Sequence, residues 1–177
     1  MPERTISSRR IYDGRILNLR VDTVELPDGK TSTREIVEHR GAVALVVLDG
    51  ERNVLLVRQY RKPLERYMVE IPAGTLEPGE APDRCAEREI QEETGFAARS
   101  FERLGGFYSA PGFCTEYLHL YLATDLVPSA LSGDDDECIE LVRMPFDQAL
   151  ALIVSGEICD SKSVAGLLLA ARRLGAP

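Results

Sequence analysis

The most apolar stretch of the chain is the run GAVALVVL at residues 41–48. An almost uninterrupted apolar run of this length predicts a strand buried on both faces of a sheet. Before it, residues 11–26 carry scattered apolar positions among polar ones, and the turn Pro27-Asp28-Gly29 leads into a second extended segment at 34–38. These segments predict an antiparallel hairpin ahead of the core. Four further strands are expected, at 53–60, 101–108, 117–126 and 139–143.

Three segments have the pattern of amphipathic helices, namely 81–94, 146–155 and 163–174. In the first of them Ala86 and Ile90 lie four residues apart and can face a core, while the remaining positions are charged. Pro82 suits a first helical turn, and Gly95 suits the position just after the last one. Because strands and helices mix without strict alternation, we expect an α+β fold or a three-layer α/β/α sandwich.

Composition indicates an ordinary globular chain of 177 residues, 44% apolar and 28% charged. No apolar run approaches the roughly 20 residues that a membrane span needs, and the first ten residues lack the apolar stretch of a signal peptide. We therefore expect a cytoplasmic protein that uses no membrane. The four cysteines form no C-x-x-C pair, so neither a zinc site nor a disulfide framework is expected.

The formal net charge of −8 argues against nucleic acid as a partner, and no basic stripe interrupts it. A substrate that carries phosphates would be repelled by such a surface unless its charge were neutralised locally. Divalent metal ions are the natural means of doing so.

Acidic residues concentrate in the first predicted helix, where residues 80–93 contain six acids against two bases. Glu89 and Glu93 lie four residues apart, and Glu92 lies three from Glu89, so all three share one side of the helix. Like charges at this spacing destabilise an isolated helix, whereas a hard divalent cation with oxygen ligands reverses that penalty. The alternative interpretation is a solvated acidic helix face.

The spacing within residues 74–96, GTLEPGEAPDRCAEREIQEETGF, favours the metal site. It resembles the Nudix box, G-x5-E-x7-R-E-U-x-E-E-x-G-U, at every defined position, where U is a bulky apolar residue. The matching residues are Gly74, Glu80, Arg88, Glu89, Ile90, Glu92, Glu93, Gly95 and Phe96. The resemblance implies a Nudix fold, a three-layer α/β/α sandwich with a mixed central sheet. Residues 41–177 would form the hydrolase domain and residues 1–40 an N-terminal β extension.

The resemblance also assigns roles. Glu89 and Glu93 would bind metal directly, and Glu92 would be a ligand, a water-mediated contact or a catalytic group. The residue before the box glycine often lends its carbonyl to a metal in this family, which implies Ala73. Arg88 would orient the glutamates, and for Glu80 a structural or outer role is as consistent as a catalytic one.

Similarity to the ADP-ribose pyrophosphatase subfamily extends from about residue 10 to 170. It rests on the segments Arg34–Val43, Arg58–Pro63, Glu70–Gly74, Ser109–Glu116 and Gly156–Ser163, the last resembling a G-x-I-x-D-x-K-[ST] ending. The implied reaction is hydrolysis of ADP-ribose to AMP and ribose 5-phosphate, assisted by two or three Mg²⁺ (or Mn²⁺) ions that bridge the phosphates. GDP-mannose or ADP-glucose as substrate stays open, as does a domain that binds ADP-ribose without cleaving it.

Candidate contacts to the substrate follow from the same similarity, and each has a plainer alternative. Arg58 or Arg61 would contact a phosphate or form surface salt bridges. Arg34 with Glu35 would hold the adenine or its phosphate side, or would likewise be surface ion pairs. The substrate loop would present Pro111, a marker residue of the subfamily, and Glu116, either a ribose contact or a plain surface acid.

Two further expectations concern the rest of the chain. The acidic loop at 133–137 would supply Glu137 as a metal ligand and Asp135 in place of a glutamate base, or it is a solvated turn. Lys162, at a predicted helix start, is expected in a structural ion pair. Subfamily resemblance also implies a homodimer in which the N-terminal strands reach over the partner.

Overall fold

The computed structural model of the chain describes residues 2–131 and 138–175. It divides into two compact units, one made of residues 1–41 and 107–117 and the other of residues 42–106 and 118–177. The first segment of the smaller unit ends at residue 41. Residues 107–117 return to that unit from much later in the chain.

The smaller unit is built on a three-stranded antiparallel sheet in the order β1-β2-β3. Strands β2 (Leu17–Glu25) and β3 (Thr31–His39) form the predicted hairpin. Strand β1 (Arg4–Asp13) was not expected from the sequence beyond its last residues. All ten of its residues are exposed, so no buried face imposes an alternation that a sequence pattern could reveal.

Residues 107–117 join this unit through backbone hydrogen bonds to the end of β3. The N–H of Val37 donates to the carbonyl of Phe113 at 2.8 Å, and the N–H of Thr115 donates to the carbonyl of Val37 at 2.9 Å. The side-chain hydroxyl of Thr115 also accepts from the N–H of His39 at 3.0 Å. The segment that contains Pro111 and Glu116 is therefore hydrogen-bonded to the C-terminal part of β3.

The larger unit contains a seven-stranded mixed sheet with the path β10-β5-β4-β9-β8, in which β6 pairs with β5 and β7 with β4. Every residue of β4 (Ala42–Leu48) is buried, as its apolar run predicts. It runs antiparallel to β5 (Asn53–Arg61) and parallel to β9 (Tyr117–Pro128). The remaining strands are β6 (Arg66–Glu70), β7 (Ala73–Thr75), β8 (Phe96–Tyr108) and β10 (Ile139–Pro145), with a short 3-10 helix at Lys62–Leu64.

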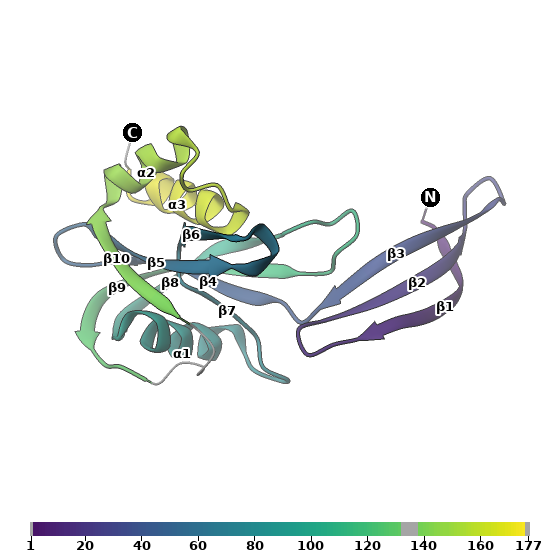
Figure 1. The fold of residues 1–177 in the computed structure, drawn as a ribbon, viewed down its shortest axis with the longest axis horizontal. Coiled ribbons are helices and arrows are strands. Elements are labelled where there is room, and N and C mark those ends of the chain that lie inside the picture. The colour runs from purple at the N-terminus through teal and green to yellow at the C-terminus, as the bar shows by residue number, and fades with distance from the viewer. Residues whose placement is uncertain (1, 132–137, 176–177) are drawn as a thin grey trace. The chain divides into compact units, whose positions relative to one another are not determined.

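Helices cover both faces of this sheet, α1 (Pro82–Thr94) on one and α2 (Phe146–Ser155) with α3 (Ser161–Arg173) on the other (Figure 1). The three-layer α/β/α sandwich with a mixed sheet is confirmed. Helix α3 begins two residues earlier than expected because Asp160 caps it, accepting a hydrogen bond from the N–H of Ser163 at 3.1 Å. Within residues 2–131 and 138–175 no helix is long and apolar enough to cross a bilayer.

Strands β6 and β7 were missed by the sequence patterns, because they span only five and three residues. Segments this short show too few alternations to be told from loops. Together they carry the chain from the 3-10 helix through Ile71 and Pro72 to Gly74, where the acidic motif begins.

Candidate active site

Helix α1 sets the direction of each acidic side chain. Its core face buries Cys85, Ala86 and Ile90, so the neighbouring positions on the helix lie along its flanks. The helix ends where Gly95 adopts a left-handed conformation with φ 74°, and the N–H of Gly95 donates to the carbonyl of Gln91 at 3.1 Å.

Arg88 joins three of the motif's carboxylates. Its Nη1 donates to Glu89 at 2.6 Å and to Glu92 at 2.9 Å, while its Nε and Nη2 hold both oxygens of Glu80 at 3.1 and 3.0 Å. The hydrogen bond from Arg88 holds the pKa of Glu80 below its usual value, and that same bond is the largest cause of the raised pKa of Arg88. Arg88 therefore occupies the orienting position expected of it, and Glu80 braces Arg88 from the other side.

Glu93 contacts the residue that directly precedes the motif. Its Oε2 accepts a hydrogen bond from the N–H of Ala73 at 2.9 Å. The structure thus brings together two of the predicted metal-binding residues, one from α1 and one from β7.

Gly74 allows β7 to pass directly over Glu89. A methyl group at position 74 would lie 1.7 Å from Oε1 of Glu89 and 1.8 Å from its Cδ. Since Glu89 is only 8% exposed, its carboxylate has little room to move aside. The glycine is required here by close approach, which is one of the uses of glycine in strands.

The predicted donor set suits a hard divalent cation, because it consists of carboxylate oxygens and the backbone carbonyl of Ala73. Among the described residues, no three histidine, cysteine or acidic side chains converge on one point as a metal site. Arg88 donates to both Glu89 and Glu92, and Glu93 accepts from the N–H of Ala73. The assignment of Ala73, Glu89, Glu92 and Glu93 as ligands remains a prediction.

The two candidate phosphate-binding arginines both have protein partners. Arg58 pairs with Glu140 at 3.0 Å and lies 4.3 Å from the ring centre of Tyr67. Arg61 donates through Nε and Nη2 to the buried carboxylate of Glu70, with its shortest contact at 2.5 Å. A contact to phosphate by either residue would compete with these interactions.

The other predicted substrate contacts belong to the smaller unit. Arg34 donates to Glu3 through Nε at 3.0 Å, and Glu35 is exposed on the same strand. Pro111 is exposed, and Oε1 of Glu116 lies 3.5 Å from Nδ1 of His39. The remaining two site candidates, Asp135 and Glu137, lie outside the described residues.

A buried ionic network was only partly expected. Nζ of Lys162 donates to Glu70 at 2.8 Å and to Asp160 at 2.9 Å, which confirms the structural ion pair predicted for Lys162. Burial of Glu70 would raise its pKa, but the hydrogen bonds from Arg61 and Lys162 outweigh that effect and hold the pKa below its usual value. In the sequence, Glu70 stands directly before the apolar pair Ile71-Pro72. An acidic residue at that place could have suggested a buried ion pair.

Ser163 ends the Gly156–Ser163 segment that resembles the subfamily's ending, but no individual role was assigned to it from the sequence. It is fully buried, and its Oγ accepts a hydrogen bond from the N–H of Ile71 at 2.8 Å. The segment Asp160-Ser161-Lys162-Ser163 has the spacing of a helix cap, so a structural role for it could be predicted from the local sequence. The contact of Ser163 with Ile71, just before the acidic motif, could not be predicted in this way.

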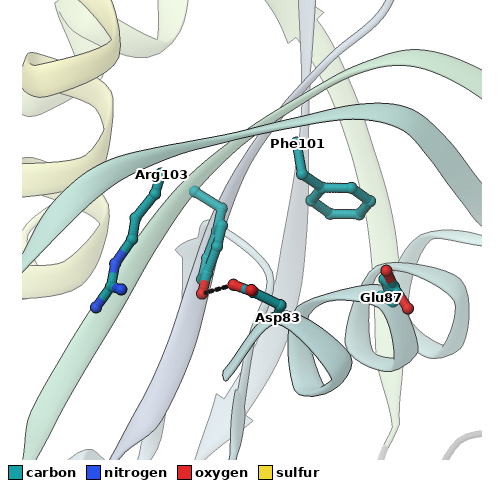
Figure 2. A pocket seen from close by; sticks show the side chains of 5 residues that line it. Asp83, Glu87, Phe101 and Arg103 are labelled. Carbon is teal, nitrogen blue, oxygen red and sulfur yellow. Dashed lines mark hydrogen bonds between the residues drawn. The ribbon is translucent and has the colours of Figure 1, made fainter. Parts of the chain in front are cut away.

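A separate pocket of about 360 Å³ lies on another side of α1, between the helix and strands β8 and β9. Figure 2 shows Asp83 and Glu87 facing Phe101 and Arg103 across it, and the hydroxyl of Tyr121 donates to Asp83 at 2.6 Å. Burial and this hydrogen bond raise the pKa of Tyr121. None of Glu80, Glu89, Glu92 and Glu93 lines the pocket, so it is distinct from the candidate metal site.

Comparison with known proteins matches the larger part of the chain to one family. The model of the NUDIX domain matches residues 38–163, and that of the nucleoside diphosphate sugar hydrolase N-terminal domain matches residues 3–37. The ADP-ribose pyrophosphatase of Bacillus subtilis (strain 168) is 44% identical over 165 residues, which cover 92% of this chain and 89% of that protein. The methanol dehydrogenase activator of Bacillus methanolicus is 48% identical over 164 residues, with the same coverages.

A solved structure described as an ADP compounds hydrolase has the same fold. It superimposes with a TM-score of 0.86, covering 100% of this chain and 98% of that one, at 23% sequence identity.

Proposed function

The chain belongs to the Nudix family, and from that premise we propose that it hydrolyses the pyrophosphate bond of ADP-ribose to give AMP and ribose 5-phosphate. The observation that carries the proposal is the intact set of motif carboxylates, held in place by Arg88 on α1. A domain that only bound the nucleotide would not need this arrangement. The choice of ADP-ribose rests on the 44% identity to a bacterial ADP-ribose pyrophosphatase.

Nudix hydrolases generally need divalent metal ions. We propose two or three Mg²⁺ or Mn²⁺ ions per site, held by Glu89, Glu92, Glu93, the carbonyl of Ala73 and Glu137. When bound, such ions neutralise the phosphate charge and lower the pKa of a coordinated water. The local concentration of acidic residues then becomes a means of gathering a polyanionic substrate, which a protein of net charge −8 would otherwise repel.

The chain's own residues hold the ligands in place. Arg88 keeps Glu89 and Glu92 on one side of α1, and the N–H of Ala73 restrains the rotation of Glu93. We assign a phosphate contact to Arg58 or Arg61, which would exchange part of an existing ion pair for a charge-assisted bond to the substrate. Arg34, Glu35, Pro111 and Glu116 are proposed to contact the base and the ribose.

The proposed substrate is tested with a panel of ADP-ribose, ADP-glucose and GDP-mannose in Mg²⁺, with released AMP, GMP and phosphosugar separated and quantified. We expect kcat/KM to be highest for ADP-ribose. A higher value for GDP-mannose or ADP-glucose would reassign the substrate within the family. Tight binding of ADP-ribose without any turnover would instead indicate a non-catalytic domain.

The catalytic base is proposed to lie in the acidic loop, with Glu137 and Asp135 as candidates and Glu92 of the motif as the alternative. We expect Glu137→Gln to lower kcat far more than it weakens ADP-ribose binding, because a group that acts in the transition state affects turnover. A base contributes about 10²–10⁴-fold. Asp135→Asn is the matched comparison, and if both variants kept kcat within about threefold of wild type, well below that range, the base would be sought at Glu92.

A homodimer is proposed as the working assembly. It is supported by β1, whose large apolar side chains Ile6, Ile11 and Tyr12 are 50%, 44% and 58% exposed on an edge strand. Deletion of residues 1–38 should weaken both association and substrate affinity. Sedimentation that showed an active wild-type monomer at assay concentration would contradict the proposal.

A further inference from the structure

The chain from the end of β6 into β7 is anchored to three different elements at three consecutive residues, Ile71, Pro72 and Ala73. The N–H of Ile71 donates to Ser163 of α3 at 2.8 Å, and the carbonyl of Pro72 accepts from the backbone of β4 at 2.9 Å. The N–H of Ala73 then donates to Glu93 of α1 at 2.9 Å. A shift of one of these residues moves the next one along the backbone. A displacement of Ile71 by the first turn of α3 is therefore expected to reach Ala73 and, through its N–H, Glu93.

Helix α3 holds Ile71 at a second point. Gly166 lies one turn after Ser163, and a methyl group there would come within 2.7 Å of Cδ1 of Ile71 and 3.3 Å of Cγ2 of Val46. Ile71 and Ser163 are both fully buried. The side chain and the N–H of Ile71 are therefore both fitted against the same face of α3, with no free space on the side of Gly166.

The neighbouring charges reinforce this attachment. Glu70 precedes Ile71 and Lys162 precedes Ser163, and the two charged groups are paired at 2.8 Å with both side chains largely buried. Asp160 accepts from Lys162 and also caps the helix through the N–H of Ser163. Two adjacent residues of the chain before β7 are thus joined to two adjacent residues of α3. Glu70 and Lys162 form an ion pair, and Ile71 and Ser163 form a neutral hydrogen bond.

We propose that the first turn of α3 is a positioning device for the carboxylate of Glu93, acting through Ile71 and Ala73. Ser163 and Lys162 are positioning residues here, because they act through their contacts with Ile71 and Glu70. The inference rests on the proposed function in one respect, the assignment of Glu93 and the Ala73 carbonyl as metal ligands. Ligands need to be held to within about 0.5 Å by surrounding contacts, and this route supplies such contacts from the opposite face of the sheet.

The test compares Ser163→Ala with Ser161→Ala. Ser161 is an exposed serine in the same helical turn, so the control makes the same chemical change away from Ile71. Two quantities are measured, the affinity of the full-length, metal-stripped protein for Mn²⁺ by calorimetric titration and the hydrogen-exchange rate of the Ala73 amide by NMR. In Ser163→Ala we expect affinity for Mn²⁺ about tenfold lower and exchange at Ala73 about tenfold faster. Ser161→Ala should match wild type, and Ser163→Thr, which keeps the hydroxyl, should recover most of the loss.

Local and global effects are separated by the amides of β4. A positioning role predicts unchanged exchange at Val46, whereas general destabilisation would accelerate Val46 together with Ala73 and would overturn the proposal. Gly166→Ala displaces Ile71 without removing any hydrogen-bonding group, and it should lower the affinity for Mn²⁺ in the same direction. If Ser163→Ala does not fold, the Mn²⁺ affinity of Gly166→Ala tests the positioning role instead.

The outcomes also separate this proposal from the proposed function. If no substrate of the panel is hydrolysed while Mn²⁺ binding and Ala73 exchange respond as expected, the positioning role stands and the function fails. If ADP-ribose is hydrolysed while Ser163→Ala behaves like wild type in both measurements, the positioning role is wrong. Failure of the wild-type protein to bind Mn²⁺ would overturn the positioning of a metal ligand as well.

Discussion

At the scale of single residues, the candidate site depends on a few close contacts rather than on the number of acids. Arg88 holds three carboxylates, and Gly74 leaves just enough space for Glu89 beneath β7. Both residues stand at fixed positions of the motif, and the structure shows a separate physical requirement for each. Arg88 supplies positive charge among the acidic side chains, and Gly74 leaves room for Glu89 because it has no side chain.

Gly74→Ala should therefore displace Glu89. The added methyl would fall 1.7 Å from a carboxylate oxygen that is buried, so we expect a loss of about 1–3 kcal/mol in the free energy of unfolding from overpacking. Metal affinity should fall by about 10–100-fold. Urea unfolding and Mn²⁺ titration measure the two effects. Gly50→Ala is the control, because nothing lies within 4 Å of the position that a methyl would take there, and equal behaviour of both variants would refute the steric argument.

Glu93→Gln should lower kcat/KM for ADP-ribose by about 100-fold or more, because loss of a direct metal ligand should cost at least as much as the largest losses typical of outer-shell contacts. The amide oxygen can still accept the hydrogen bond from Ala73, so the shape of the site is kept while its negative charge is lost. The thermal midpoint should stay near that of wild type. Wild-type turnover in this variant at saturating Mg²⁺ would show that Glu93 is not a metal ligand.

At the scale of elements, Glu70 connects β5, β6 and α3 through Arg61 and Lys162. A buried carboxylate is stabilising only where such partners compensate for its burial. The pKa of Glu70 lies below its ordinary value of 4.5. A group with a lowered folded pKa contributes stability that is fully present above the unfolded pKa and is lost as pH falls through the folded pKa.

Glu70→Gln should lower the free energy of unfolding at pH 7 by about 3 kcal/mol, because Arg61 and Lys162 would be left without their shared counter-charge. It should also flatten the dependence of stability on pH below about 4.5, since the titrating group is gone. Urea unfolding between pH 3 and pH 7 measures both effects. Glu140→Gln removes the exposed partner of Arg58 and is expected to change stability by less than about 1 kcal/mol. A Glu70→Gln variant that kept the acid dependence of wild type would contradict this account.

At the scale of the whole molecule, the net charge of −8 opposes the binding of a polyanionic substrate. In the proposed function, metal ions resolve that conflict at one place on the surface while the rest stays acidic. Arg88 offsets part of the repulsion among the acidic side chains of α1 when no cation does.

Removal of metal should thus abolish turnover and leave the fold intact. After dialysis against EDTA, hydrolysis of ADP-ribose should fall to background and return on addition of Mg²⁺. The thermal midpoint should rise with Mg²⁺ concentration, since a ligand that binds only the folded state stabilises it. Undiminished turnover in excess EDTA would contradict metal dependence.

The sequence alone determined the buried strand β4, the three helices and the acidic motif on α1. These features depend on spacings of a few residues, which helical and strand geometry convert directly into faces. The positions of Glu89, Glu92 and Glu93 along one helix follow from the same local rule. So does the left-handed turn at Gly95.

Only the tertiary structure shows which distant residues support the carboxylates of α1. The hydrogen bonds of Ile71 to Ser163 and of Lys162 to Glu70 each join residues 92 positions apart, and no local pattern indicates which distant groups will meet. Strand β1 and the attachment of residues 107–117 to β3 are likewise set by pairing between separate segments. The physical reason is that the energy of these contacts arises only after the sheet has assembled, when buried polar groups must find partners within the enclosed interior.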